Sequence, residues 1–257
     1  MTESYRIAIV GAGILGLAHA YLAARAGKSV VVFEKNPRAA GASIRNFGMI
    51  WPIGQPTGEM LELARTSRAL WLEVLLQAKL PFRETGSLHL AYRKDEADVA
   101  QEFAGFGPEL GYACSWMGRD AVLERSHAVR SDGLMGGLWS STELTVDPKQ
   151  IIRALPAFLA GLFGVQFVFN ALVTGIDVPA VETTAGRWIA ESVIVCSGDD
   201  FQTLYPGEFR VSGLTLCKLQ MMRTEIQPGN WQLGPSLAAG LTLRFIRHFR
   251  YVLRCQS

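Results

Sequence analysis

The stretch Arg6-Ile-Ala-Ile-Val-Gly-Ala-Gly-Ile-Leu-Gly16, followed by Val30-Val-Val-Phe-Glu34, decides the fold. It predicts a buried strand, a glycine turn, a helix with small packing residues, a second strand and then a carboxylate. Gly11 suits a tight turn, Gly13 lets a pyrophosphate approach the backbone, and Gly16 lets the helix lie close to the sheet. The first turn of the helix adds unpaired N–H groups. The pattern is that of a Rossmann-type unit that binds a dinucleotide.

Glu34 stands at the end of the second predicted strand, at the distance from Gly16 that the dinucleotide fingerprint requires. A carboxylate there accepts hydrogen bonds from a ribose diol and repels a 2′-phosphate, so NADP is disfavoured. The pattern does not separate NAD from FAD. The alternative, a glycine-rich turn that binds nothing, is disfavoured by the agreement of strand, helix and carboxylate.

Length and composition limit the remaining possibilities. A chain of 257 residues can fold as one large domain or two smaller ones. We expect a cytoplasmic globular protein, because no apolar run is long enough to span a membrane and no signal peptide precedes the first strand. The net charge of +2 gives no reason to expect nucleic acid as a partner. The scattered cysteines lack metal-site spacing, so free thiols and no metal are expected at Cys114, Cys196, Cys217 and Cys255.

The rest of the chain predicts a mixture of helices and strands. Helices are expected at residues 59–77, 94–103, 120–125 and 148–160, the last of them capped by Asp147. Strands are expected at residues 87–92, 165–169, 172–177, 180–183, 187–190, 192–198 and 214–223, with a strand or turn at 133–139. This order predicts an α/β fold. A discontinuous Rossmann-type domain, residues 1–80 and 145–212, would carry an inserted mixed α+β substrate domain, residues 81–144 and 213–257.

Three further features give the chain a resemblance to a known family. The loop Gly41-Ala-Ser-Ile-Arg-Asn-Phe-Gly-Met49, the position of Val173 and the strand end Val195-Cys-Ser-Gly198 resemble FAD-dependent oxidoreductases of the D-amino-acid oxidase and glycine oxidase family. The resemblance covers nearly all of the chain and implies FAD as the cofactor. It implies that the cofactor is bound by Gly11, Gly13, Ile14, Leu15, Gly16, Glu34, Lys35, Ala42, Ser43, Arg45, Asn46, Phe47, Gly48, Met49, Val173, Cys196, Ser197 and Gly198.

Within the family, residues 43–56 and 217–224 most resemble a bacterial clade associated with aminophosphonate breakdown. The resemblance implies oxidative deamination of a small amine, amino acid or aminophosphonate. A hydride would pass from the α-carbon to flavin N5, water would hydrolyse the imine, and oxygen or another acceptor would reoxidise the flavin. No catalytic base is required, and none is assigned. Arg45 and Arg244 are the candidates for binding the substrate's anionic group, against the alternative that both are surface arginines.

Three other residues have plainer interpretations. His89 lies on a predicted strand, where we expect it to face solvent or to be satisfied by hydrogen bonds. Lys218 and Met221 lie on the predicted strand 214–223, which faces the flavin or is an ordinary part of a sheet. Cys196 is interpreted as a small buried residue beside the cofactor.

The end of the chain departs from the family pattern near Arg244, and no Asp or Glu follows Glu225. Because the family's members continue further, our hypothesis is a truncated member with an incomplete flavin pocket. A nucleic-acid or membrane-surface helix at residues 241–257 is the alternative for this basic, apolar tail. Two other functions compete. One is a flavin enzyme that uses NAD(P)H, for which a second glycine-rich turn is missing. The other is a non-catalytic Rossmann remnant that binds a nucleotide or a partner without turnover.

Overall fold

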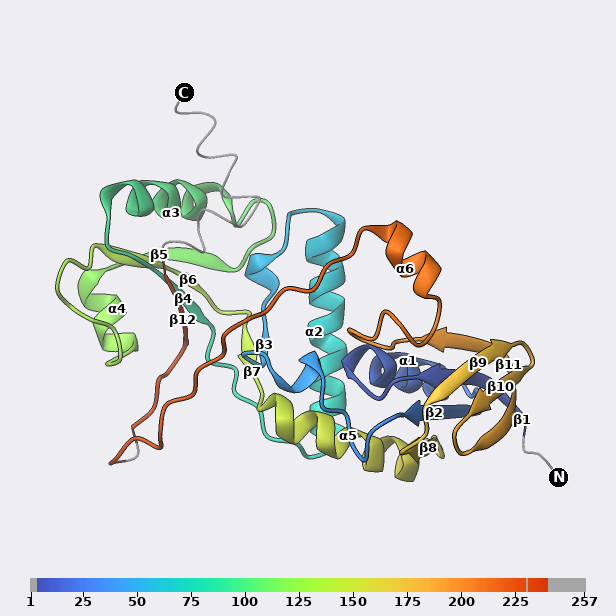
Figure 1. Ribbon diagram of the computed structural model, residues 1–257. Helices are drawn as coiled ribbons and strands as arrows, with labels where there is room; N and C mark the ends of the chain where they lie inside the picture. Colours follow the sequence, from blue (N-terminus) through green and yellow to red (C-terminus); the bar gives the residue numbers. More distant parts are fainter. Residues whose placement is uncertain (1–3, 230, 240–257) are drawn as a thin grey trace. The chain divides into compact units, whose positions relative to one another are not determined.

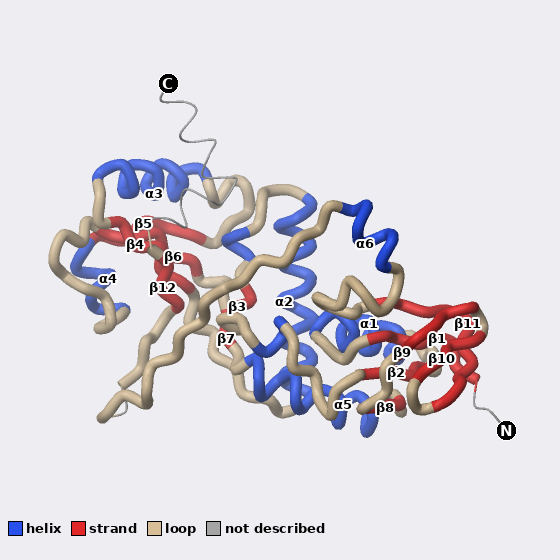
Figure 2. The backbone as a smooth tube through the Cα atoms, in the orientation of Figure 1, coloured by secondary structure: helices blue, strands red, loops and turns tan. Residues whose placement is uncertain are grey.

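The computed structural model of the protein describes residues 4–229 and 231–239 (Figures 1 and 2). Contacts between Cα atoms divide the described chain into two compact units. Unit 1 comprises the residues up to Phe47 and Asp147–Arg223, and unit 2 comprises Gly48–Val146 and the described residues from Thr224 on. Each unit is built on a separate sheet, and the two sheets share no strand.

Unit 1 is built on a six-stranded sheet in the order β8-β2-β1-β11-β10-β9, drawn in red near the N-terminus in Figure 2. β1 pairs in parallel with β2 and β11, and β2 pairs in parallel with β8. β10 then continues the sheet antiparallel to β11 and to β9. This arrangement confirms the predicted α/β architecture. The strands are β1 (Ser4–Val10), β2 (Val30–Glu34), β8 (Gln166–Phe169), β9 (Val173–Asp177), β10 (Ala180–Thr183) and β11 (Gly186–Val195).

Two helices of unit 1 follow directly from local sequence. Helix α1 (Ile14–Arg25) begins after the glycine turn and buries one face made largely of small and apolar residues. Helix α5 (Pro148–Phe163) begins at the Asp147 cap, whose carboxylate accepts hydrogen bonds from the backbone of Lys149 at 2.9 Å and Gln150 at 3.3 Å. It ends at Gly164, which takes the left-handed conformation of a helix C-cap. The two helices pack against each other.

Unit 2 contains a four-stranded sheet in the order β12-β4-β6-β5. β4, β6 and β5 are antiparallel neighbours, and β12 pairs in parallel with β4. Phe103 and Leu138 are fully buried in the cluster that joins this sheet to helix α3. The elements are α2 (Glu59–Gln77), β4 (Ser87–Ala91), α3 (Lys94–Phe106), β5 (Cys114–Gly118), α4 (Arg119–Arg125), β6 (Gly136–Ser140) and β12 (Ser236–Ala238). Sequence analysis did not predict β5, whose short Cys-Ser-Trp-Met-Gly run has little β-branched character.

Residues 48–80 lie in unit 2, although the sequence analysis placed them with the Rossmann-type domain. Strand β3 (Met49–Ile50) pairs with β7 (Leu144–Thr145), and the 3-10 turn η2 (Pro52–Gly54) follows it. Ile53 and Leu61 are buried in the same cluster as Phe103. The hydrogen bond from Ile53 N to Glu143 joins residues 90 positions apart along the chain, so no local pattern reports this packing. The assignment of FAD-binding and substrate roles to domains stays a prediction.

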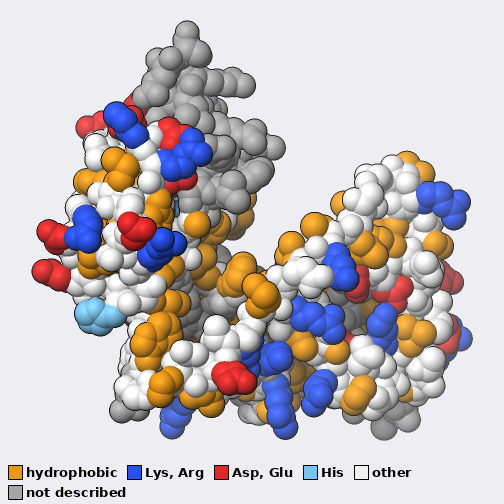
Figure 3. Space-filling model, turned by 60° about the vertical axis from the view of Figure 1, so that its left-hand side comes forward, with side chains coloured by type: hydrophobic (Ala, Val, Ile, Leu, Met, Phe, Trp, Pro, Cys, Tyr) orange, Lys and Arg blue, Asp and Glu red, His pale blue; other side chains and the backbone are white. Residues whose placement is uncertain are grey.

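The predicted strand at residues 214–223 is wrong, because this segment has no strand pairing. Its apolar side chains reach solvent: Leu216 is 68% exposed and Met222 is 95% exposed. Figure 3 shows hydrophobic side chains in orange lying among charged ones on one face of the molecule. The two strands predicted at 187–190 and 192–198 form the single strand β11, which ends at Val195.

His89 is fully buried on β4, so it does not face solvent. Its ring stacks on Trp51 with 5.8 Å between the centroids, and its Nε2 lies 3.4 Å from Ser87 Oγ. Ser87 Oγ donates to the buried carboxylate of Glu143 at 2.9 Å, which also accepts from Ile53 N at 3.1 Å. His89 is therefore part of a buried polar network within unit 2. None of the described helices combines the length and apolarity needed to cross a membrane.

Candidate functional site

The carboxyl ends of three parallel strands meet at one edge of the unit 1 sheet. β1 leads into Gly11, β2 ends at Glu34 and β11 leads into Cys196. Gly11 N donates to Phe33 O at 2.7 Å and Cys196 N donates to Val10 O at 2.8 Å, so backbone hydrogen bonds hold the three ends together. Ligands of open α/β sheets bind at such an edge.

The glycines of the turn are in close contact with their surroundings. Gly11 has φ of +99°, and a Cβ built on it would lie 2.3 Å from the carbonyl O of Cys196. A Cβ on Gly16 would lie 1.9 Å from the carbonyl O of Gly11, so only glycine lets α1 pack this closely on the turn. A Cβ on Gly13 would lie 3.1 Å from Ser43 Oγ. The geometry agrees with the tight turn and the close helix packing that the sequence predicts.

The first turn of α1 carries backbone N–H groups that helical hydrogen bonding cannot use. Ile14 N donates to Ser43 Oγ at 2.9 Å, so the 3-10 turn η1 (Ala42–Ile44) is joined to the start of the helix. Among the described residues, the N–H groups of Gly13 and Leu15 have no hydrogen-bond acceptor. Both residues line the cavity described below, where these groups favour an anionic ligand.

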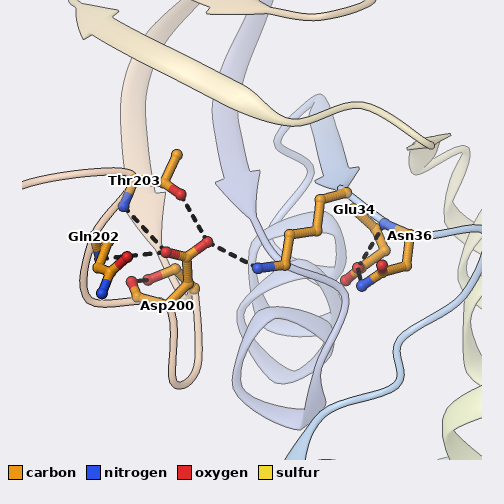
Figure 4. A network of polar contacts seen from close by, with 7 residues as sticks. Glu34, Asn36, Asp200, Gln202 and Thr203 are labelled. Carbon is orange, nitrogen blue, oxygen red and sulfur yellow. Dashed lines mark hydrogen bonds and ion pairs between the residues drawn. The ribbon is translucent and has the colours of Figure 1, made fainter.

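Glu34 is buried, and its carboxylate accepts three hydrogen bonds. Oε2 accepts from Ala12 N at 3.1 Å, which joins Glu34 to the glycine turn. Oε1 accepts from Asn36 N and Asn36 Nδ2, both at 3.0 Å, and Figure 4 shows the two side chains facing each other. Because a carboxylate offers about four acceptor positions, capacity remains for one hydroxyl donor.

These residues line a cavity of about 660 Å³ within unit 1. Most of the residues predicted to bind a cofactor come together around it. They are Gly11, Gly13, Ile14, Leu15, Glu34, Lys35, Ala42, Ser43, Arg45, Asn46, Val173, Cys196, Ser197 and Gly198. The glycine turn, the Glu34 carboxylate and the cavity thus occupy one edge of the sheet, an arrangement that fits a dinucleotide.

The remaining predicted cofactor residues do not line this cavity, for different reasons. Gly16 is buried beneath the turn, and Phe47 is 79% exposed. Gly48 and Met49 belong to unit 2, where Gly48 O accepts a hydrogen bond from Val146 N at 2.9 Å. A loop read as one motif from the sequence is therefore divided between the two units.

One wall of the cavity was missed by the sequence analysis. It is formed by the segment after β11, with Asp199, Asp200, Thr203, Leu204 and Phe209. Asp200 Oδ2 pairs with Lys35 Nζ at 2.8 Å and accepts from Thr203 Oγ1 at 2.9 Å, while Oδ1 accepts from the backbone of Thr203 at 3.1 Å and Gln202 at 3.3 Å (Figure 4). The Lys35 ammonium and these hydrogen bonds hold the pKa of Asp200 well below its ordinary range. An Asp three residues before a Thr is a turn pattern that could have been noticed.

Cys196 lies at the cavity wall without a sign of redox pairing. Its Sγ is 4.0 Å from His19 Nδ1, which itself lies 2.7 Å from Leu15 O. Burial raises the pKa of the Cys196 thiol, so the neutral form is favoured. Cys196 is thus a small, partly buried residue at the cavity wall, and its place beside a cofactor stays a prediction. Among the described residues, no group of His, Cys, Asp and Glu has the arrangement of a metal site.

Only one of the two arginines proposed to bind a substrate anion lies in the described part of the chain. Arg45 is exposed and lines the cavity, next to η1. Arg244 lies outside the described residues. Lys218 and Met221, on the unpaired segment 214–223, do not line the cavity.

Comparison with known proteins agrees with this geometry. A family model described as FAD-dependent oxidoreductase matches residues 6–251. The chain is similar to a glycine oxidase of Geobacillus kaustophilus, with 27% identity over 210 residues that cover 77% of this chain and 55% of the relative. It is also similar to a D-amino acid dehydrogenase of Cereibacter sphaeroides, with 26% identity over 254 residues that cover 75% of this chain and 58% of the relative.

Solved structures show the same fold. The crystal structure of the Geobacillus kaustophilus glycine oxidase matches with a TM-score of 0.68 and 27% identity, over 77% of this chain and 56% of that one. The L-α-glycerophosphate oxidase of Mycoplasma pneumoniae, solved with FAD bound, matches with a TM-score of 0.72 over 94% of this chain and 66% of that one. Its 18% identity supports the fold alone. The chain spans a little over half the length of the curated relatives it matches. The family match nevertheless covers nearly the whole chain, and the protein belongs to the FAD-dependent oxidoreductase family, whose cofactor is FAD.

Proposed function

We propose that the protein binds FAD in the cavity of unit 1 and oxidises the C–N bond of a small amine, an amino acid or an aminophosphonate. One observation carries the proposal: the glycine turn and the Glu34 carboxylate line a single cavity at the carboxyl edge of a parallel sheet. Family membership supplies the cofactor, and the amino-acid-oxidising relatives support the substrate class.

In this proposal each part of the cavity holds a different part of the dinucleotide. Glu34 accepts a hydrogen bond from the adenosine ribose, because its carboxylate has capacity left after three internal donors. The free N–H groups of Gly13 and Leu15 receive the pyrophosphate, helped by the positive end of α1. The η1 turn and Cys196 line the part of the cavity that we assign to the side of the flavin ring.

The reaction uses few protein groups. When bound, FAD supplies the two-electron acceptor that takes a hydride from the carbon bearing the amine. Arg45 is the described residue that we propose for binding the substrate anion, since a guanidinium fork matches both carboxylate and phosphonate. Arg244 keeps the same proposed role from the sequence. Aminophosphonate as the substrate rests on the similarity of residues 43–56 and 217–224 to one clade.

Two further assignments complete the proposal. The electron acceptor is oxygen or another oxidant, as in the oxidases and dehydrogenases among the relatives. The cytoplasm is the proposed compartment, and it is supported by the described cysteines, Cys114, Cys196 and Cys217, which are free thiols.

The test is the visible spectrum of the purified chain after reconstitution with FAD. We expect a stoichiometric flavin band that bleaches on anaerobic addition of glycine, a D-amino acid or 2-aminoethylphosphonate, and peroxide release on readmitting air if oxygen is the acceptor. A chain that retains no FAD would overturn the proposal. A retained flavin that none of the amines bleaches would favour the non-catalytic alternative.

A further inference from the structure

The cavity wall that follows β11 is held in place by few contacts. Residues 199–209 line the cavity, yet the helix α6 (Pro206–Ser212) at its end buries none of its residues. Leu204 is the one large side chain of this wall that is buried, and Phe201 stacks on Phe209 with 4.9 Å between the ring centroids. A wall with so little apolar anchoring depends on its polar contacts to stay closed.

One of those contacts is the ion pair between Lys35 and Asp200. The Asp200 side chain is 14% exposed, which makes it the most buried acid in any of the described ion pairs, and Lys35 is 47% exposed. The same carboxylate accepts hydrogen bonds from Gln202 and Thr203, so it shapes its own turn while it reaches across to the end of β2 (Figure 4). One carboxylate therefore connects the cavity wall at residues 199–209 to the end of β2.

The position of the pair relates it to the ligand. Lys35 directly follows Glu34, the proposed ribose ligand, and both Lys35 and Asp200 line the cavity. In the proposed function this pair lies at the adenosine end of the cavity. Because one partner is half exposed, its strength falls as salt screens it.

We propose that Lys35 and Asp200 are positioning residues that form a latch over the adenosine end of the cavity, and that opening of this latch limits FAD release. The inference rests on the proposed function, since it requires FAD in this cavity. The competing interpretation is a purely structural one, in which Asp200 only caps its turn and Lys35 contributes nothing.

The experiment measures the FAD dissociation rate of the reconstituted full chain by flavin fluorescence. We compare Lys35→Met, Asp200→Asn, the double variant and the charge swap Lys35→Asp with Asp200→Lys. Each single variant should release FAD roughly three- to tenfold faster, as expected for breaking a partly buried pair. The double variant should be no faster than the singles, the swap should recover part of the loss, and added salt should speed release from the wild type more than from Lys35→Met.

Two controls separate the alternatives. Lys28→Met removes an exposed lysine that lines no described cavity and should leave release unchanged. Thr203→Val removes one hydrogen bond to the Asp200 carboxylate and keeps both charges of the ion pair, so it should speed FAD release less than Asp200→Asn does. Release from Lys35→Met at the wild-type rate would overturn the latch while leaving FAD binding intact. Failure of the wild type to retain FAD would instead overturn the proposed function.

Discussion

The glycine turn of unit 1 and the segment 214–223 were both predicted to contain strands, and they have opposite outcomes. Residues 4–34 form strand, turn, helix and strand as predicted, with every residue of β2 buried. Residues 214–223 are also rich in apolar side chains, yet they pair with no strand and leave Leu216 and Met222 in solvent. A strand-like pattern indicates that a segment is able to pair in a sheet. The strand forms only where another strand is available as its partner.

The difference lies in where the partner comes from. In the turn, the βαβ connection brings β2 back beside β1, and Val10 meets both Phe33 and Val195 in register. When a strand, a helix and a second parallel strand follow one another in this way, the connection is right-handed in nearly all proteins. Among the described residues no strand pairs with residues 214–223, so local composition alone could not decide the structure of this segment.

The largest effect is expected from changing the turn itself. Gly16→Ala would place a Cβ 1.9 Å from Gly11 O, a backbone atom that cannot move aside cheaply. We expect a loss of about 3 kcal/mol in the free energy of unfolding and loss of FAD retention. Urea unfolding followed by circular dichroism measures the first, and the flavin absorbance of the gel-filtered protein measures the second.

Gly161→Ala is the matched control for this change. Gly161 lies in helix α5, and a Cβ there meets no atom within 4 Å. The substitution should be neutral or stabilise by about 0.5 kcal/mol, because alanine favours the helix. An unchanged unfolding midpoint in Gly16→Ala would contradict the close packing described for the turn.

Glu34→Ala should have the next largest effect. It leaves the buried Ala12 N–H without its acceptor, at about 2 kcal/mol in the free energy of unfolding, and removes the proposed ribose contact. We expect FAD affinity to fall at least about tenfold, measured by titration of flavin fluorescence. Glu191→Gln, which breaks the exposed pair with Arg6, should change neither quantity appreciably. Equal FAD affinity in Glu34→Ala and wild type would remove Glu34 from the site.

Thiol reactivity compares the two regions within one molecule. Cys217, exposed on the unpaired segment, should react with a maleimide first, and Cys196 at the cavity wall should react more slowly and be protected by FAD. Cys114 should react last, because burial raises the pKa of its thiol to about 11 and almost no thiolate exists at pH 8. Labelling followed by peptide mass spectrometry assigns each site. Fast labelling of Cys196 in the FAD-saturated chain would contradict its place beside the ligand.

The smallest effect is expected on the segment 214–223. Leu216→Ser should change the free energy of unfolding by less than about 0.5 kcal/mol, since the side chain is exposed already. The matched change in the turn region, Leu17→Ala, removes a fully buried side chain and should cost about 2 to 5 kcal/mol. A loss near 2 kcal/mol in Leu216→Ser would show that another strand covers this segment.

Much of unit 1 was predictable because its patterns are local. The Asp147 cap, the glycine end of α5 and the buried run of β2 each involve residues within one or two turns of one another. Helix α2 was predicted with its observed bounds for the same reason. The burial of His89 and the missed strand β5 were not predictable, because both depend on unit 2 neighbours that are distant in sequence.

The sequence by itself determined the strand, the glycine turn and the position of Glu34, the parts that we propose to hold the dinucleotide, because Gly11, Gly13, Gly16 and Glu34 form one local pattern. Only the tertiary structure decided what encloses that site. The pairing of Lys35 with Asp200 joins residues 165 positions apart, and other long-range contacts, such as the pairing of Met49 with Thr145, place Gly48 and Met49 in unit 2. The physical reason is that backbone conformation is set by near neighbours, whereas a cavity wall is made by whichever distant side chains burial brings together.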